Sequence, residues 1–226
     1  LINNYKLQEH KISTIWHALK MEEYQNISPQ RVEKIKKELS IKENNFILGM
    51  VARGEEWKGH IYAIKAISLL KNKYPNICLL IIGIDDSQKY GMKLTNYLHI
   101  HQLTDNIRLI KFVPDNVALY RLFDIQIHVP IDKMSETFGI TYIEGMISSC
   151  PQILTRSGIA YTTAKNLENC LVVDYCNSDE IANAIITLCN NPSLRKKIAE
   201  NAKIYAKQNF PYSLKVDKHL QLYSEL

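Results

Sequence analysis

Apolar residues in this chain gather in short continuous runs, each bounded by charged or turn-forming residues. The runs that have the length of buried strands are 46–52, 77–83, 106–112, 124–130, 151–155 and 171–173. Continuous apolar runs of this length are typical of parallel strands that are covered on both faces. The stretches between most of them are long enough for a crossover helix. The pattern therefore predicts an α/β fold, a doubly wound, Rossmann-like parallel sheet of about six strands.

Elsewhere the apolar residues recur with helical spacing. After Ser28-Pro29, a favourable helix start, Val32, Ile35 and Leu39 share one face of a helix. Four apolar residues with the same spacing, Ile61, Ile64, Ile67 and Leu70, predict a second helix after E-E-W-K-G. Further helices are expected from Asp85 to about Gln102, from near Gly139, and over 179–190, 192–207 and 213–226, and a strand-like piece is expected at 12–16.

The stretch from Ser135 to Pro151 carries the strongest candidate chemistry. Glu136 stands eight positions before Glu144, between the predicted strands 124–130 and 151–155. This order places Glu136 in a loop beyond the carboxyl end of a strand, where open α/β sheets bind ligands. The free backbone N–H groups at the start of the next helix suit an anion such as phosphate. Acidic residues near a helix start are also common for purely structural reasons, so the spacing alone leaves both roles open.

A second loop, after the predicted strand 46–52, offers two cations, Arg53 and Lys58. Gly54 and Gly59 have the spacing of a phosphate-binding P-loop, but His60 follows where that motif needs a lysine, which argues against a P-loop NTPase. Arginine and lysine beside a helix start are well suited to phosphate oxygens. The chain has no G-x-G-x-x-G, which argues against a dinucleotide oxidoreductase, and no D-x-D metal pair.

Composition adds few constraints. The chain has 226 residues, a formal net charge of +5 and five cysteines, none in a C-x-x-C pair. We expect free thiols in a reducing cytoplasm and no metal. Acidic residues interrupt the basic ones in the stretch 30–39, and no nucleic-acid partner is expected. The longest apolar run, 77–84, is too short to cross a bilayer. The chain begins at Leu1 inside what reads as running sequence, so we expect a fragment of a longer protein.

Two of these stretches resemble a known family, the GT-B glycosyltransferases of family 4, also called glycosyl transferases group 1. Its Glu-x7-Glu signature is matched by Glu136, Phe138, Gly139, Ile140, Glu144, Gly145, Met146 and Pro151. Gly145 and Ser149 stand where the family has alanine and glycine. Arg53 and Lys58 resemble its G-R-x-x-x-x-K-G element, and His17 and Leu19 its H-G-V-D entry, with Ala18 in place of the glycine. The resemblance covers nearly the whole chain from about Ile12.

The resemblance implies the donor-binding C-terminal half of a retaining, metal-independent glycosyltransferase that needs no cofactor besides its nucleoside diphosphate sugar. Arg53, Lys58 and the amides of Gly139, Ile140 and Thr141 would bind the diphosphate. Glu144 would accept hydrogen bonds from the ribose, and Glu136 would hold the sugar. Glu136, Arg53 and Lys58 are the implied catalytic residues, and Val113 and Phe138 complete the implied nucleotide-sugar site.

The same resemblance divides the chain into an entry segment (1–28), a nucleotide-sugar-binding domain (29–210) and a C-terminal helix (211–226) that packs back on a missing N-terminal Rossmann-like domain. It implies a saccharide or lipid-linked acceptor, with peripheral contact at the inner face of the cell membrane. The turn at 157–162 departs from the family's G-G-x-P-E pattern, which leaves a truncated, non-catalytic nucleotide-sugar-binding module as an alternative. A GT-B epimerase is a third reading.

Overall fold

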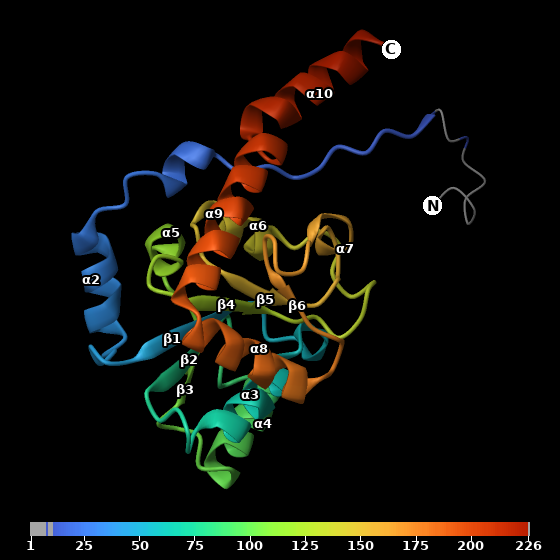
Figure 1. Cartoon of the computed structure of the whole chain (residues 1–226). Coiled ribbons are helices and arrows are strands. Elements are labelled where there is room, and N and C mark those ends of the chain that lie inside the picture. The colour runs from blue at the N-terminus through green and yellow to red at the C-terminus, as the bar shows by residue number, and fades with distance from the viewer. Residues whose placement is uncertain (1–7, 9–10, 226) are drawn as a thin grey trace.

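A six-stranded parallel sheet forms the centre of the computed structural model, which describes residues 8 and 11–225 (Figure 1). The strands follow the order β3-β2-β1-β4-β5-β6. Their bounds are β1 Phe46–Val51, β2 Ile77–Ile82, β3 Ile107–Ile110, β4 Ile125–His128, β5 Gln152–Leu154 and β6 Leu171–Val172. All five neighbouring pairs are parallel. The predicted fold class, a doubly wound Rossmann-like sheet, is confirmed.

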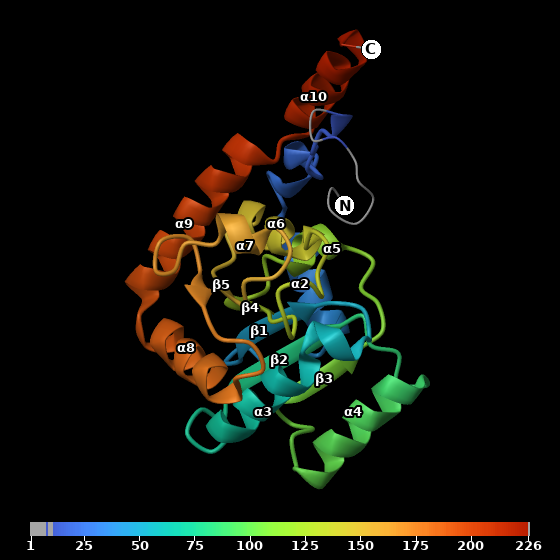
Figure 2. The same cartoon turned by 90° about the vertical axis from the view of Figure 1, so that its right-hand side faces the viewer.

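Helices cover both faces of this sheet (Figures 1 and 2). The helices α3, α4 and α8 lie on one face, and α2, α5, α6 and α7 lie on the other. The helix α9 runs along the side, where it contacts both α6 and α8. The helix bounds are η2 Met21–Tyr24, α2 Pro29–Glu38, η3 Glu56–Lys58, α3 His60–Leu70, α4 Lys89–Ile100, α5 Asn116–Leu119, α6 Ile140–Ile147, α7 Ala160–Thr163, α8 Ser178–Asn190, α9 Pro192–Asn209 and α10 Tyr212–Ser224.

The apolar runs form strands because they are covered on both sides. All six residues of β2 are buried, and β2 lies between β1 and β3. On one face its side chains pack with α3 and α8 around Ile64, Ile67 and Ile185. On the other face they join a cluster that includes Leu119 and Tyr120. A continuous apolar sequence is what a strand with two buried faces requires.

The strand order creates a crevice at one edge of the sheet. β1 pairs with β2 on one side and with β4 on the other, so the chain winds away from β1 in both directions. Loops that follow two such strands part toward opposite faces, and ligands bind between them at the carboxyl ends. In this chain the two loops are 52–59 and 129–139. This topology brings the predicted cation loop next to Glu136.

Two local predictions are wrong. Residues 12–16 form no strand; instead Leu19, farther along, makes an isolated bridge with Pro211. The helix expected from Asp85 begins at Lys89. The carboxylate of Asp85 accepts hydrogen bonds from the backbone N–H of Ser87 (3.1 Å) and from its hydroxyl (2.6 Å). These bonds hold a turn, which competes with the first turn of a helix.

The C-terminal helix α10 projects away from the body in both views (Figures 1 and 2). None of its described residues is buried, and its exposed residues include the apolar Val216 and Leu220. Its base is fixed to the N-terminal segment, because the N–H of Leu19 donates to the carbonyl of Phe210 (3.0 Å) and the N–H of Tyr212 to the carbonyl of Leu19 (3.1 Å). The boundaries at 28/29 and 210/211 stay predictions; residues 1–7, 9–10 and 226 lie outside the described part of the chain.

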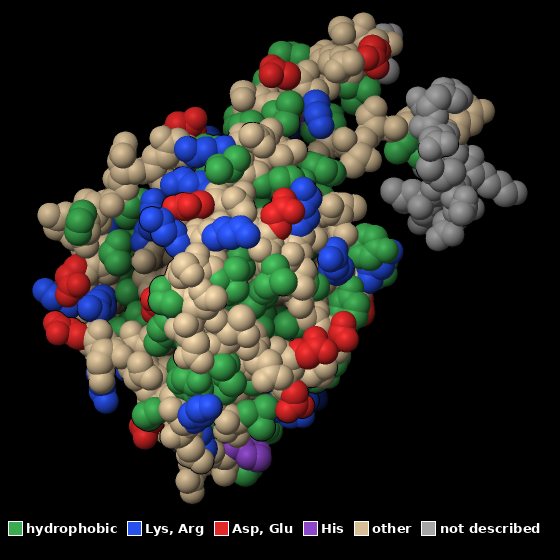
Figure 3. Space-filling view, in the orientation of Figure 1, with side chains coloured by type: hydrophobic (Ala, Val, Ile, Leu, Met, Phe, Trp, Pro, Cys, Tyr) green, Lys and Arg blue, Asp and Glu red, His purple; other side chains and the backbone are tan. Residues whose placement is uncertain are grey.

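The surface carries mixed charges. On the face shown in Figure 3, Lys and Arg side chains gather around α9 among scattered acidic ones. Burial and the nearby positive charges of Arg121 and Lys207 lower the pKa of Lys203, so these three cations lie close together. Across residues 8 and 11–225, we find no helix with the length and apolar character that crossing a bilayer demands.

Candidate active site

The loop after β1 carries Lys58 to the crevice through a close backbone contact. Gly59 has a φ of +80°, and a Cβ at this position would lie 1.9 Å from the carbonyl oxygen of Val129 in the loop after β4. Only glycine allows both the left-handed conformation and this approach. Lys58, just before it, is buried, and its ammonium group lies 4.1 Å from the centre of the Trp57 ring.

Glu136 is the partner of this lysine. The ammonium of Lys58 donates to Oε2 of Glu136, and each side chain is only 11% exposed. The backbone N–H of Glu136 donates to the hydroxyl of Ser157 (3.1 Å). At Gly158, whose φ is +57°, a Cβ would lie 2.9 Å from Cγ of Glu136. The turn that departs from the family pattern therefore supports Glu136 directly.

His128, the last residue of β4, lies beside this ion pair. Its side chain is 4% exposed, and its Nε2 is 4.0 Å from Oε2 of Glu136. In the part of the chain that the structure describes, that nitrogen has no hydrogen-bond partner. Burial lowers the pKa of His128 to about 4, with a further lowering by Lys58 against a raising effect of Glu136, so the imidazole is neutral at pH 7. Sequence reasoning missed His128; a histidine inside an apolar run was the available signal.

The start of α6 is fixed by two buried glutamines on neighbouring strands. Nε2 of Gln126 donates to the carbonyl of Thr141 (2.8 Å), and Nε2 of Gln152 donates to the carbonyl of Tyr142 (2.8 Å). A Cβ at Gly145 would lie 1.7 Å from Oε1 of Gln126. The glycine that replaces the family's alanine thus makes room for the glutamine pair.

The helix begins after Gly139, which has a φ of +89° and is flanked by the site residues. A Cβ there would lie 3.4 Å from both Cγ of Glu136 and Nε2 of His128. The first-turn N–H groups of α6 therefore start beside the Lys58–Glu136 pair. Farther along, Ser149 has a φ of +59°, a conformation that suits the glycine usual in the family at this position.

Glu144, on the next turn of α6, has quite different partners. The hydroxyl of Tyr24 donates to its Oε1 (3.0 Å) and that of Tyr120 to its Oε2 (2.8 Å). Burial raises the pKa of Glu144, and the two hydrogen bonds oppose that effect. Neither tyrosine was predicted to matter, and Tyr24 comes from the predicted entry segment.

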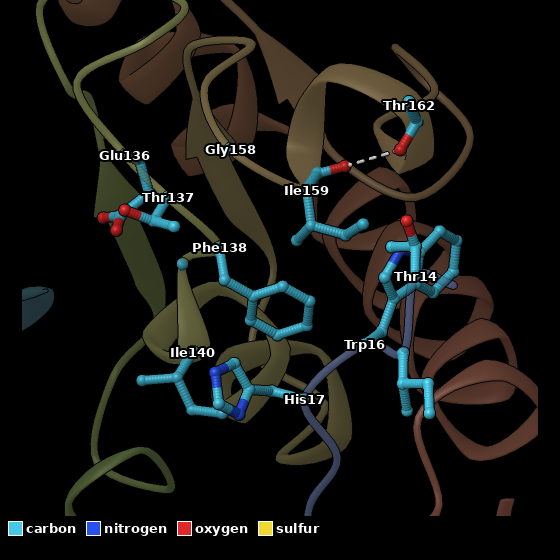
Figure 4. Close-up of a pocket in the computed structure, with 12 residues that line it drawn as sticks. Thr14, Trp16, His17, Glu136, Thr137, Phe138, Ile140, Gly158, Ile159 and Thr162 are labelled. Carbon is cyan, nitrogen blue, oxygen red and sulfur yellow. Dashed lines mark hydrogen bonds between the residues drawn. The ribbon is translucent and has the colours of Figure 1, made fainter. Parts of the chain in front are cut away.

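A hollow of about 610 Å³ opens beside the start of α6 (Figure 4). One wall is Glu136 to Ile140, another is the turn at Gly158 and Ile159, and a third is the N-terminal segment from Thr14 to His17. The Phe138 ring lies in the middle of this arrangement, edge to face with His17 at 5.2 Å between ring centres. The hollow is thus built from three segments far apart in the sequence.

The structure brings together some predicted site residues and separates others. Lys58 contacts Glu136, while Glu136, Phe138, Gly139 and Ile140 line the hollow, and Thr141 follows in the first turn of α6. Arg53 is exposed in the loop after β1 and makes no ion pair with any described residue. The side chain of Val113 is buried in the apolar core, so only its backbone is left for a ligand contact. Their roles in binding stay predictions.

Comparison with known proteins identifies the family of this chain. Residues 31–205 match the model of the family described as "Glycosyl transferases group 1". The chain belongs to this family. It is 28% identical over 214 residues to the capsular polysaccharide biosynthesis glycosyltransferase CapM of Staphylococcus aureus, an alignment that covers 93% of this chain and 54% of CapM. The chain spans about half the length of the curated relatives it matches.

Solved structures share the fold of this chain. A glycosyltransferase from Rickettsia africae superposes with a TM-score of 0.92 at 28% identity, over 99% of this chain and 59% of that one. HepE of Anabaena, in a crystal structure with UDP and glucose, superposes with a TM-score of 0.88 at 23% identity, over 97% of this chain and 58% of that one. The second likeness shows the shared fold.

Proposed function

We propose that this chain is the donor-binding half of a retaining, metal-independent glycosyltransferase that transfers a sugar from a nucleoside diphosphate sugar to a hydroxyl acceptor. The observation that carries the proposal is the meeting of Lys58, Glu136 and the start of α6 in the crevice between the loops after β1 and β4. HepE of Anabaena, which has this fold, was crystallised with UDP and glucose, and this supports a nucleotide sugar as the ligand class.

The diphosphate is assigned to the positive side of this crevice. Lys58 supplies a compact charge, Arg53 a planar one, and the amides of Gly139, Ile140 and Thr141 supply donors at the helix N-terminus. These groups stabilise the negative charge that develops on the leaving diphosphate as the sugar departs. Because the chain provides this positive charge itself, the proposal needs no metal ion.

The two glutamates take different parts of the donor. A carboxylate has about four lone-pair positions, so Glu144 can accept from the ribose hydroxyls while it keeps Tyr24 and Tyr120. Glu136 lies at the hollow and holds the transferred sugar through its hydroxyls. In this proposal Glu136 is not a covalent nucleophile. The acceptor attacks the face that the diphosphate leaves, and the departing phosphate assists, so the anomeric configuration is retained.

The remaining partners are proposed from the relatives. The similarity to CapM supports a saccharide or lipid-linked acceptor in polysaccharide synthesis. An N-terminal Rossmann-like domain is proposed to cover the exposed apolar residues of α10 and to complete the active site, without which this half is inactive. The net charge of +5 and the basic cluster of Arg121, Lys203 and Lys207 support peripheral contact with the inner membrane surface from the cytoplasm.

Calorimetry on the chain tests the donor site. We expect one of UDP, GDP and ADP to bind with the same affinity in EDTA as in magnesium. Lys58→Met should weaken that binding at least about tenfold, since a charge-assisted contact to phosphate is lost. The matched control is Lys65→Met, an exposed lysine on α3, which should bind like the parent. Binding that requires magnesium would contradict metal independence, and failure of all three nucleotides would contradict the donor site.

Catalysis needs the longer protein. A nuclear magnetic resonance time course should show product with the anomeric configuration of the donor, and the opposite anomer would contradict the retaining assignment. A non-catalytic binding module remains the second candidate, because the turn at 157–162 departs from the family pattern. The support that Ser157 and Gly158 give to Glu136 favours the enzyme. Nucleotide-sugar binding without any transfer by the longer protein would decide for the module.

A further inference from the structure

We propose that His128 is a positioning residue that takes over the Glu136 carboxylate when a bound diphosphate draws Lys58 away from it. The inference rests on the proposed function and goes beyond it, because it assigns a role to a residue outside the Glu-x7-Glu and Arg–Lys elements. Nε2 of His128 would donate the hydrogen bond that replaces the contact with Lys58.

A bound diphosphate and the carboxylate of Glu136 compete for Lys58. Its ammonium contacts the carboxylate of Glu136 in a site where each side chain is 11% exposed. A diphosphate at the start of α6 carries more negative charge than one carboxylate and competes for the same ammonium. When Lys58 turns to the phosphate, Glu136 is left as a buried carboxylate without a cation, which is strongly unfavourable. Tight donor binding therefore needs a second partner for Glu136.

His128 provides an unpartnered polar atom beside Glu136. Among the described residues, four buried side-chain atoms lack a hydrogen-bond partner, namely Nε2 of His60, Nε2 of His128, Oγ of Ser148 and Oε1 of Gln152. Of these, Nε2 of His128 lies 4.0 Å from Oε2 of Glu136. Hydrogen bonds of this kind measure about 2.7–3.2 Å, so a side-chain shift of about 1 Å completes the contact. The backbone can stay in place, since Ser157 holds the N–H of Glu136.

The other side of the imidazole favours the required tautomer. Nδ1 of His128 faces the hydroxyl of Thr141 at 3.4 Å. A threonine hydroxyl can donate to Nδ1, which leaves the ring proton on Nε2, toward Glu136. Because the imidazole is neutral, it gives Glu136 a donor without adding a cation that competes with Lys58 for the phosphate. Burial, which lowers the pKa of His128 to about 4, keeps it neutral at pH 7.

A double-mutant cycle with calorimetry tests the inference, using whichever of UDP, GDP and ADP the parent chain binds. His128→Phe should weaken binding at least about fivefold when Glu136 is present, and less than about twofold when Glu136→Gln has removed the buried charge. His128→Gln, which can keep a donor near Nε2, should bind within about twofold of the parent. His60→Phe is the matched control, a second buried histidine with an unpartnered Nε2, and its effect should be equal in both backgrounds.

A second measurement works on the parent chain and does not depend on any variant folding. Nitrogen-15 spectra of the histidine rings should show His128 with its proton on Nε2, and that resonance should shift when the nucleotide is added. Equal weakening by His128→Phe in both Glu136 backgrounds, no weakening at all, or a proton found on Nδ1 would overturn the inference while the nucleotide still binds. If the parent binds no nucleoside diphosphate, the proposed function fails first, and this inference fails with it.

Discussion

The two glutamates of one short stretch are held in opposite ways. Glu136 lies in a loop and is neutralised by the cation Lys58, which comes from the loop after β1. Glu144 lies on α6 and is held by two neutral hydroxyls, from Tyr24 and Tyr120. The ammonium of Lys58 can leave Glu136 for a phosphate, because a phosphate also binds a cation. The neutral hydroxyls of Tyr24 and Tyr120 gain no comparable contact from a phosphate and stay on Glu144. The difference supports the proposal that Glu136 changes partners during donor binding while Glu144 keeps its partners.

The largest expected effect comes from removing one partner of the Lys58–Glu136 ion pair. Lys58→Met leaves the buried carboxylate of Glu136 without its cation, with only the neutral donor of His128 to replace it, so it should lower the free energy of unfolding by up to about 3–5 kcal/mol. Glu136→Gln should cost only about 1 kcal/mol, because the lysine stem can carry its ammonium toward the open crevice and Gln still accepts a hydrogen bond. Urea denaturation of both variants measures the difference. If both variants lose the same free energy of unfolding, the carboxylate does not depend on the cation more than the cation depends on the carboxylate.

The second largest expected effect is on the pH dependence of stability, to which His128, beside Glu136, and Glu144 contribute with opposite signs. The pKa of His128 is lowered to about 4, so the unfolded chain binds its proton more readily, and stability is lost as the pH falls from about 6.5 to about 4. By linkage this loss approaches roughly 3 kcal/mol at the acid end. The pKa of Glu144 is raised above 4.5 by burial, so its contribution runs the other way: it is present below that pH and lost as the pH rises.

Denaturation of variants between pH 7 and pH 4 measures these slopes. His128→Gln should flatten the acid-side loss, and Glu144→Gln should steepen it, since the opposing contribution is removed. His99→Gln, which replaces an exposed histidine on α4, is the matched control for the loss of one imidazole. A His128→Gln chain that loses stability in acid as steeply as the parent would contradict the buried neutral histidine.

Ligand affinity should distinguish the glutamates in a third way. Glu144→Gln should weaken a nucleoside diphosphate and its nucleotide sugar alike, by about 1.5–3 kcal/mol or roughly tenfold and more, because both ligands carry the ribose. Glu136→Gln should spare or tighten the nucleoside diphosphate, since Lys58 is released, and should weaken the nucleotide sugar. Calorimetry with both ligands measures this. Two variants that bind both ligands like the parent would show that the glutamates serve only the helix start.

The smallest expected effect concerns the tyrosine hydroxyls that hold Glu144. Tyr24→Phe removes one of the two hydroxyl donors to Glu144 and should lower the free energy of unfolding by roughly 1–1.5 kcal/mol. Nucleotide affinity should fall only about twofold to threefold, because Tyr120 still fixes the carboxylate. Thermal denaturation and calorimetry provide both values, with the exposed Tyr223→Phe on α10 as control. A loss as large as that of Lys58→Met would make Tyr24 more than a supporting donor.

Local pattern was sufficient for much of this molecule. The apolar runs predicted the strands because a parallel strand needs both faces covered, and the motif around Gly139 predicted the start of α6, which begins at Ile140. Sequence also placed Lys58 and Glu136 in loops that follow strands. Prediction from the sequence failed where a local hydrogen bond or a partner distant in the sequence determines the backbone conformation. Asp85 holds a turn with Ser87, and Leu19 pairs with Pro211 while residues 12–16 form no strand.

The partners of the site residues were decided by tertiary structure alone. Lys58 and Glu136 are 78 residues apart, and Tyr24 and Glu144 are 120 apart, so no spacing in the sequence announces either contact. Lys58 and Glu136 meet because the sheet places β4 beside β1, although β2 and β3 come between these two strands in the chain. Parallel strands present their carboxyl ends at one edge, and the order of strands determines which loops share it. The sequence by itself identified the chemical groups of the site. The order of the strands in the sheet determined which of those groups contact one another.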